Sequence, residues 1–456
     1  MLYEPPVIQN VAGHRYRWLL AATVLTAGLA SYSTASAATL CVKPNRQSGC
    51  EATIGVAVAA ASPGDVIQVA EGIYNEQVTI NKPLSLVATP GSQTIIDATN
   101  FTTGIFVNGM STAPNPGVSN VLISGFTVRN ANFEGILAVN ASDVTIVGNH
   151  VTENNRALDI NGGTCPGIPV FETNEGVDCG EGIHLMAVED STVIHNEIDH
   201  NAGGVLLSDE TGPSQHNYIH GNDVHDNPFD CGITMASHAP ATSVIPSATV
   251  SFGVINNIVE QNISRHNGKQ APGAGAGVGI FAPAPGATAS GNVVIGNDLL
   301  DNGMPGVAMH NHAFAPAPAP PVNLNDNAII GNHFSGNAAD ASDTATSGPT
   351  GINIASLAPV TGTVIDRNSF DSEAVDIAFK VPAGELAAHF NSFSTGTGID
   401  NLGSGTVDAS NNWWNCSLGP VGRPRCATVV GSAVSSTPFL SVLFSTSIPA
   451  YDSHER

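Results

Sequence analysis

Apolar and polar positions along the chain follow a six-residue pattern: an apolar residue, two variable residues, Asn, one variable residue and a second apolar residue. Seven copies have Asn149, Asn196, Asn222, Asn257, Asn297, Asn332 and Asn368 as their Asn residues, and a degenerate copy at 123–128 has Phe126 instead. In six copies a second Asn follows five residues later, as Asn154, Asn201, Asn227, Asn262, Asn302 and Asn337. Successive copies lie 26 to 47 residues apart, so the chain accommodates insertions between them.

Each copy is followed by a small residue and an alternation of apolar and variable residues, as in Gly182-Ile183-His184-Leu185. The small residues are Gly135, Gly182, Gly204, Gly232, Gly277, Gly306, Gly351 and Ala374. A period of two predicts short strands whose side chains point alternately inward and outward. A single coil of such strands cannot bury its apolar side, so we expect successive coils to stack into a solenoid.

Stacking predicts that equivalent residues form columns. We expect Asn149, Asn222, Asn257, Asn297, Asn332 and Asn368 to lie at equivalent corners, where Asn tolerates left-handed backbone and can bond neighbouring amides. The predicted core consists of Ile146, Val193, Ile219, Val254, Val294, Ile329 and Ile365 from one strand family, with Ile183, Val205, Ile233, Val278, Val307 and Ile352 from the other.

The two ends of this region carry further patterns. Residues 57–69 and 72–78 resemble the capping helix and first strands of right-handed parallel β-helix proteins of the pectin-lyase-like class, and Asn412–Cys416 with Gly419-Pro420 resembles their closing motif. The repeats resemble most the NosD-like proteins and the carbohydrate-binding and sugar-hydrolysis repeat domains. The resemblance covers about Cys41 to Pro438.

This resemblance implies an all-β fold, a single-domain right-handed parallel β-helix over residues 38–440 with an N-terminal capping helix. The cap is expected within 41–80, with a helix over Glu51–Ala61, a C-terminal cap within 405–440 and a tail over 441–456. Trp413 and Trp414 either plug the last coil or form an exposed platform for sugar stacking.

The first 37 residues are typical of a signal peptide. His14, Arg15 and Arg17 precede an apolar run, and Ala35-Ser36-Ala37 offers small residues for cleavage. A single membrane anchor is the alternative, but the run from Trp18 to Ala30 is shorter than the roughly 20 residues that span a bilayer. We therefore expect a secreted or periplasmic protein.

Seven cysteines fit an oxidising compartment. Short separations predict three disulfides, Cys41–Cys50, Cys165–Cys179 and Cys416–Cys426. Cys231 is left over, either as a small buried residue or as a reactive thiol.

The charge balance narrows the partners. With 14 basic against 38 acidic residues the formal charge is −24, which excludes a basic nucleic-acid binder. Such a chain also repels anionic polymers unless a cation such as Ca²⁺ bridges them. A neutral polysaccharide is therefore the expected ligand class, bound by a monomer.

Pro-rich insertions follow several of the Gly-apolar strands, over 237–248, 282–289, 313–322 and 357–362. Because all leave the same edge of the coil, they are expected to form a wall beside the outward face of these strands. That face predicts a groove for an extended polymer, since neighbouring strands repeat about every 4.8 Å.

Titratable and polar side chains at or near this face are the candidate site. Carboxylates and imidazoles there can act as acid and base in glycosidic cleavage or bind a divalent ion. The catalytic candidates are Asp159, His184, Asp209, Glu210 and His310, and the ligand-binding candidates are Thr234, His238, His312, Asn353 and Asp376. For a metal, the preferred set is His310 and His312 with His184 and His238.

Three functions remain open at this point. The first is binding, with processing, of extracellular or cell-wall polysaccharide. The second is a scaffold without catalysis, and the third is a NosD-like role in metal handling, although the chain has only six Met. The motifs expected of polygalacturonases and pectin methylesterases are missing, and the basic residues that a pectate lyase needs are scarce, with Lys380 and Arg156 nearest the groove.

Overall fold

The computed structural model describes residues 37–444 apart from 92, 113–116, 160, 174–178, 271–274, 284, 312–319, 342–345 and 422–423. The predicted leader up to Ser36 and the tail beyond Phe444 lie outside the described residues. The residues described after Ser36 form one compact unit. Within it, no helix has both the length and the apolar character needed to cross a membrane.

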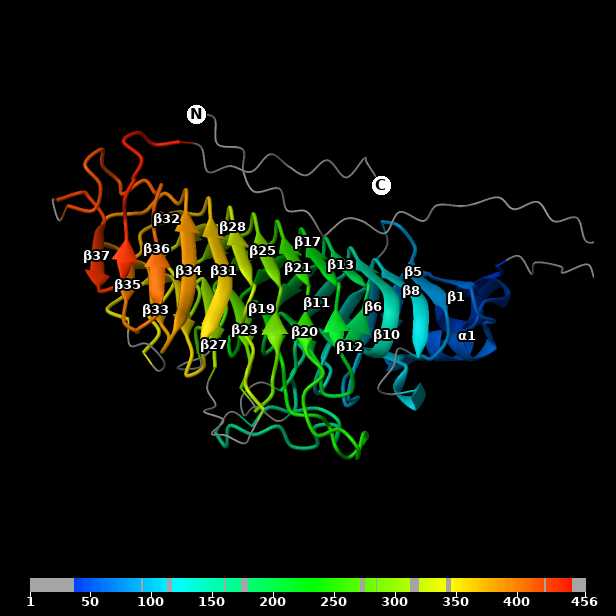
Figure 1. Cartoon of the computed structure of the whole chain (residues 1–456). Helices are drawn as coiled ribbons and strands as arrows, with labels where there is room; N and C mark the ends of the chain where they lie inside the picture. Colours follow the sequence, from blue (N-terminus) through cyan, green and yellow to red (C-terminus); the bar gives the residue numbers. More distant parts are fainter. Residues whose placement is uncertain are drawn as a thin grey trace, which may run out of the picture. The chain divides into compact units, whose positions relative to one another are not determined.

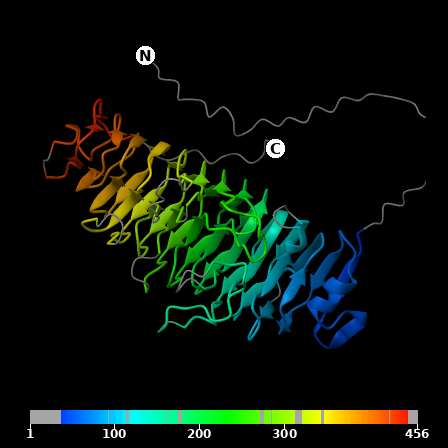
Figure 2. The same ribbon diagram turned by 60° about the horizontal axis from the view of Figure 1, so that its bottom comes forward.

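Parallel strands stack in chain order, as Figures 1 and 2 show. The Gly-apolar strands form what we call the first column. It consists of β4 (Val78–Ile80), β7 (Ile105–Asn108), the first part of β10 (Ile136–Val147), β12 (Ile183–Glu189), β15 (Val205–Ser208), β19 (Ile233–Ala236), β23 (Val278–Phe281), β27 (Val307–His310), β30 (Thr350–Ala355), β33 (Val375–Lys380), β35 (Thr397–Asn401) and β37 (Thr428–Gly431).

The strands that precede the repeated Asn form the second column. It consists of β1 (Thr39–Val42), β2 (Val66–Val69), β5 (Leu84–Ala88), β8 (Val118–Ser124), the second part of β10, β13 (Thr192–Ile194), β17 (Tyr218–His220), β21 (Ile258–Glu260), β25 (Val293–Ile295), β28 (Ala328–Ile330), β31 (Val360–Asp366), β34 (Gly384–His389), β36 (Thr406–Asp408) and β38 (Val434–Ser435). The short strands β16 (Ser214–Gln215), β20 (Val254–Ile255) and β24 (Ala289–Ser290) lie between the two columns along the chain.

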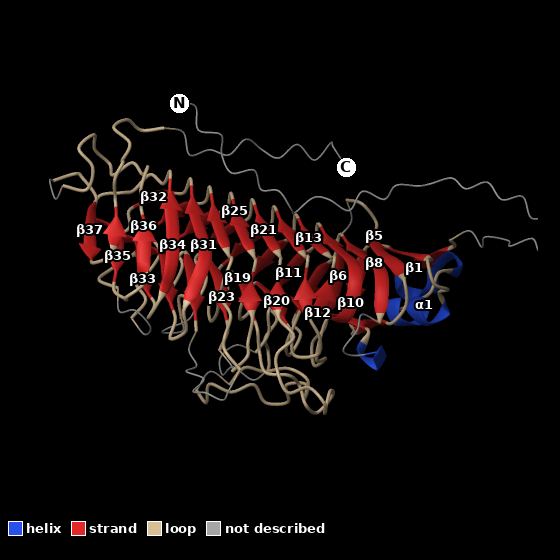
Figure 3. Ribbon diagram, viewed as in Figure 1, coloured by secondary structure: helices blue, strands red, loops and turns tan. Residues whose placement is uncertain are grey.

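The third column is a separate sheet. It consists of β3 (Gly72–Tyr74), β6 (Thr94–Asp97), β9 (Thr127–Arg129), β11 (His150–Thr152), β14 (Glu197–Asp199), β18 (Asp223–His225), β22 (Ile263–Arg265), β26 (Asp298–Leu300), β29 (His333–Ser335) and β32 (Ser369–Asp371). All pairings between these named strands are parallel, so the predicted stack of parallel coils is confirmed (Figure 3).

The core lies inside the coils, as the period-two pattern requires. Every residue of the predicted core is fully buried in one continuous cluster. Toward the C-terminus, the inward position two residues after the repeated Asn is occupied by aromatic residues. Their rings form a column of Phe334, Phe370, Phe393 and Trp414, with neighbouring ring centroids 4.6–5.9 Å apart. Trp414 is fully buried there, which excludes it from an exposed platform, whereas Trp413 is half-buried.

Asn side chains link successive coils. The main ladder runs through Asn149, Asn196, Asn222, Asn262, Asn297, Asn332, Asn368, Asn391 and Asn412. From Asn196 on, each Oδ1 accepts hydrogen bonds from the backbone N–H and the side-chain Nδ2 of the Asn in the coil before it, and each Nδ2 donates to a carbonyl of that coil. Phe126 takes the Asn position at the start, and its N–H donates to Asn149.

The prediction for Asn257 is wrong. Asn257 belongs to a parallel ladder five residues earlier, through Asn217, Asn257, Asn292 and Asn327. Asn262 occupies the main ladder, and Val259, not Val254, pairs with Ile219. The copy that belongs to the main ladder contains Asn262, but it has Ser264 where the pattern expects an apolar residue. Asn257 lies five residues before Asn262, which is also the spacing between the first and second Asn of the pattern, so the two residues match that pattern.

A third ladder, five residues after the main one, runs through Asn154, Asn201, Asn227, Asn267, Asn302 and Asn337 and ends at Glu373. The left-handed backbone also differs from the prediction. It falls on the residue before the ladder Asn, for example His195, Gly221 and Gln261 with φ of 54°, 63° and 53°, because the Asn itself must align with its neighbours.

The predicted helix near the N-terminus is shorter than expected. Helix α1 spans Ile54–Ala60, begins at the N-cap Thr53 and buries Ile54, Ala57 and Val58 in the core. Two short 3₁₀ helices span Pro44–Gly49 and Met110–Thr112. The three predicted disulfides form, and Cys231 is buried and unpaired with another cysteine.

Candidate functional site

The candidate residues of the first-column face have the predicted outward register, but that face is not an open groove. His184, Thr234 and Asn353 share one outward column with Leu206, Gly279 and Ala308. The side chains of these three candidates are at most 4% exposed, and so are those of Asp209, Glu210, His238, His310 and Asp376. These side chains are therefore not exposed in an open groove; over β10 and β12, the insertion that follows β11 covers the outward face.

Two candidates lie elsewhere. Asp159 is exposed in the turn after β11, where its carboxylate accepts from the N–H groups of Asn161 and Gly162, so it is not on a Gly-apolar strand. His312 lies outside the described residues.

The insertion between β11 and β12 provides much of the cover. The Cys165–Cys179 disulfide closes it, and Phe171 packs on Leu137, Val139 and Met186, the outward residues of β10 and β12. Ser243, in the loop after β19, donates to the carbonyl of Val170 at 2.8 Å, so the two insertions contact each other. Figure 1 shows these two loops, in teal and green, together below β12 and β20.

Beneath this cover lies what we call the acidic cavity, a space of about 10 Å³. It is lined by Glu134, Glu172, Glu181, His184, Glu210 and His238, with Ile168, Thr173, Cys179 and Leu206. Glu134 and Glu181 occupy equivalent positions, each before the Gly that opens a first-column strand. Glu172 comes from the insertion.

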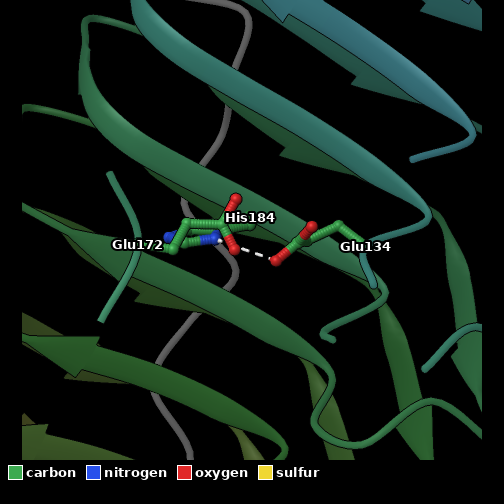
Figure 4. Close-up of side chains that lie close together, drawn as sticks. All are labelled: Glu134, Glu172 and His184. Atoms are coloured by element: carbon green, nitrogen blue, oxygen red, sulfur yellow. Dashed lines mark ion pairs between the residues drawn. The ribbon is translucent and has the colours of Figure 1, made fainter. Parts of the chain in front are cut away.

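Three of these side chains point toward one another (Figure 4). Nδ1 of His184 lies 3.7 Å from Oε1 of Glu134, too long for a hydrogen bond, and Nε2 of His184 lies 2.8 Å from Oγ of Ser208. Burial raises the pKa of Glu172 well above its usual range, and neighbouring Glu134 raises it further. Burial lowers the pKa of His184, but Glu134 and Glu181 outweigh that effect and raise it.

Asp209, Glu210 and His238 form a hydrogen-bonded group beside the cavity. Nδ1 of His238 lies 2.8 Å from Oε1 of Glu210, while the backbone N–H of His238 donates to Asp209. Burial raises the pKa of Asp209 to about 7, helped by the charge of Glu210. Burial would also raise the pKa of Glu210, but the charge and hydrogen bond of His238 lower it to about 2. Between about pH 2 and pH 7, Asp209 is therefore protonated while the adjacent Glu210 is ionised.

Further along the face, His310 joins a second buried group. Its Nε2 lies 3.1 Å from Oδ2 of Asp340 and 3.1 Å from Nδ2 of Asn353. His184 and His310 are separated by four strand steps, about 19 Å at 4.8 Å per step, so they cannot bind one ion. The predicted histidine metal set is wrong for this reason.

An open pocket of about 400 Å³ lies at the ends of β30, β33 and β35. Its lining includes the polar residues Asn311, Ser356, Lys380 and Ser404 and the apolar residues Val381, Pro382 and Leu402. Asp376, on β33, is not among the residues that line this pocket. Its carboxylate accepts hydrogen bonds from the N–H and hydroxyl of Ser394, and burial raises its pKa well above the usual range. Arg156 is remote, since it contacts Glu153 and Asn130 at the third-column turn.

Sequence reasoning missed Glu134 and Glu172. The Glu134-Gly135-Ile136 segment repeats as Glu181-Gly182-Ile183, and that match was available as a signal. Glu172 has no counterpart in the repeat, so only the folded insertion places it in the cavity.

Comparisons with known proteins agree with this architecture. A family model described as "Right handed beta helix region" matches residues 100–254. Among solved structures, the Dettilon tailspike protein has a TM-score of 0.55 at 14% identity, covering 82% of this chain and 62% of its own. The chain has the fold of a right-handed parallel β-helix.

Other β-helices with similar structures include two lyases. A pectate lyase, Pel9A, has a TM-score of 0.43 at 14% identity, covering 89% of this β-helix and 80% of its own chain. An alginate lyase from Paenibacillus sp. str. FPU-7 has a TM-score of 0.47 at 14% identity, covering 78% and 99%. No curated protein matches this β-helix in sequence.

Proposed function

We propose that this β-helix is an exported, monomeric protein that binds a neutral polysaccharide along the edge of its first column and processes it. The open pocket beside Lys380 carries the binding part of the proposal. Its volume of about 400 Å³ falls within the range typical of ligand sites, and it combines polar groups for hydroxyls with an apolar floor. The similar lyases share only the fold, so the proposal rests on this pocket.

The buried groups on the same face support the processing part. Asp209 and Glu210 follow β15 and His238 follows β19, which lie five and four strand steps from β33 at the pocket. Five steps correspond to about 24 Å, so an extended polymer bound at the pocket reaches these groups only where the covering insertions give access. Burying such groups is costly, and groups with strongly shifted pKa values gather at functional sites.

The three disulfides agree with an oxidising compartment, which supports export. The packing of α1 on the first coils supports its role as an N-terminal cap of a single domain, and the buried Trp414 supports a plug at the other end. If these ends cap the stack, they also prevent strand pairing with other chains.

A glycan array with the full chain tests the binding part, with neutral and uronate polymers presented with and without Ca²⁺. We expect a neutral glycan to bind, and Lys380→Ala to weaken binding about tenfold, the loss of one charge-assisted contact. Lys269→Ala is the matched control, because Lys269 pairs with Asp301 at a different pocket. Unchanged binding by Lys380→Ala would count against the site.

Release of reducing ends from the bound glycan tests processing. Glu210→Gln is expected to abolish release while leaving binding at the Lys380 pocket unchanged. Binding without release by the wild-type chain would instead favour the scaffold function.

A further inference from the structure

The Glu134, Glu172 and His184 side chains have the composition and placement of a metal site. They bring one imidazole and two carboxylates from three parts of the fold: the turn before β10, the insertion and β12. One ligand atom from each lies within 4.8 Å of the other two (Figure 4).

A second observation points to a missing ligand. Oε2 of Glu134, Oε1 of Glu172 and Nδ1 of His184 are buried atoms with no hydrogen-bond partner in the described part of the chain. Glu134 and His184 are themselves only 2% and 3% exposed. Leaving buried polar atoms without partners is costly, and here three such atoms belong to residues that line one small cavity.

The imidazole is also held as a metal ligand would be. Ser208 contacts Nε2 of His184, which fixes the ring and leaves Nδ1 facing the two carboxylates. A metal-bound His is usually oriented in this way through its second nitrogen.

The acidic cavity has more carboxyl than basic groups in the same place. Four Glu side chains line it against two imidazoles, and no Lys or Arg is among the described lining residues. A divalent cation would balance the charge of these carboxylates and offset the free-energy cost of burying them.

We propose that Glu134, Glu172 and His184 bind one Zn²⁺ ion. A nitrogen ligand with two carboxylates suits Zn²⁺, whereas Ca²⁺ takes six to eight oxygens and needs more room than this cavity offers. Because Glu172 belongs to the insertion, the ion ties the insertion to the first-column face. The proposal is independent of polysaccharide binding.

Zn²⁺ binding to the chelator-treated full chain is measured by isothermal titration, with limited proteolysis of the insertion as a second measurement. We expect one Zn²⁺ per chain and slower cleavage within 161–173 when Zn²⁺ is present. Glu172→Gln is expected to weaken binding about tenfold or more and to remove the effect on cleavage. Glu172 lies outside the coil core, so this variant tests the site without disturbing the stack.

Glu197→Gln is the matched control. Glu197 belongs, with His150 and Asp199, to the other group of three possible ligands, on the third column. Loss of Zn²⁺ in Glu197→Gln but not in Glu172→Gln would overturn the proposal. So would tighter binding of Ca²⁺ than of Zn²⁺, or no bound metal at all, which would make the Glu134–Glu172 pair a shared-proton pair.

Discussion

At the scale of single residues, the ladder Asn is the unit that sets one coil upon the next. The Asn222 side chain accepts from both the N–H and Nδ2 of Asn196, and it donates to the carbonyl of Val193. An amide side chain satisfies three buried groups at once, which neither Asp nor Leu can do. The residue before it then turns in the left-handed region, which Gly221 adopts without strain.

Asn262→Ala should destabilise the chain by about 3 kcal/mol, because it leaves the N–H of Asn222, one of the two Nδ2 hydrogens of Asn222 and the carbonyl of Ile219 without partners. Urea unfolding followed by circular dichroism measures this change. Asn161→Ala, at an exposed position, is the control and should have little effect. A similar loss in both variants would show that the ladder bonds are not the cause.

Glu373 occupies the end of the third ladder, where Asn337 donates both its N–H and Nδ2 to Oε1. Burial raises the pKa of Glu373 from its ordinary value of 4.5 to about 7, although these hydrogen bonds lower it. A folded-state pKa above the unfolded one means that the stabilisation by the protonated form is complete below pH 4.5 and is lost as pH rises to about 7.

Glu373→Gln should remove that loss, because Gln keeps the acceptor oxygen and cannot ionise. Relative to wild type, the variant should gain stability as pH rises from 4.5 to about 7 and show a constant difference above that. Unfolding midpoints between about pH 4 and pH 8 measure it. Glu385→Gln, at an exposed position, should follow the wild type, and a flat difference between wild type and Glu373→Gln would contradict the raised pKa.

At the scale of elements, the strands place candidate side chains and the insertions determine their environment. The first column holds His184 and Thr234 at matching outward positions. The insertion between β11 and β12 then covers that face and adds Glu172. Burial is the largest cause of the raised pKa values of Glu172 and Asp209.

Replacing Cys165 and Cys179 by Ser should loosen the insertion. The disulfide closes a 14-residue separation, and its loss returns conformational freedom to that segment. We expect faster proteolytic cleavage within 161–173, while the coils keep their circular dichroism spectrum. The Cys41→Ser/Cys50→Ser variant, which lacks the N-terminal disulfide, should be cut at the wild-type rate there; equal acceleration in both would indicate general unfolding.

At the scale of the whole molecule, each coil is stabilised chiefly by its two neighbours. Ile219 is fully buried between Val193 and Val259, and the same inward position is filled in every coil of the repeat. A stack of this kind behaves as a chain of nearest-neighbour interactions, so a defect in a middle coil weakens both halves.

Ile219→Ala should therefore lower the free energy of unfolding by roughly 2 to 4 kcal/mol, through lost burial and the cavity left behind. Ile263→Ala is the matched control, since Ile263 is 39% exposed on the outer side of β22, and it should cost less than about 1 kcal/mol. Chemical denaturation measures the free energy of unfolding of both variants. Equal losses in the two would contradict the assignment of Ile219 to the core and Ile263 to the surface.

The sequence alone determined the repeat, its direction of burial and the disulfides. Period-two alternation and recurring Asn are local signals, repeated in every coil, so their stacking follows from the need to bury one apolar side. That reasoning placed Ile183 and Ile233 in the core and His184 and Thr234 on the outward side. It misplaced Asn257 because two ladders share one spacing.

Only the tertiary structure decided which outward side chains meet and which are buried. An insertion has no repeat partner to fix its position, so its path over β10 and β12 depends on contacts with residues remote in sequence, such as Phe171 with Leu137. Glu172 meets Glu134 and His184 only after that folding, and the predicted open groove becomes a closed acidic cavity. Periodicity determines the face of a side chain, whereas burial depends on what packs over that face.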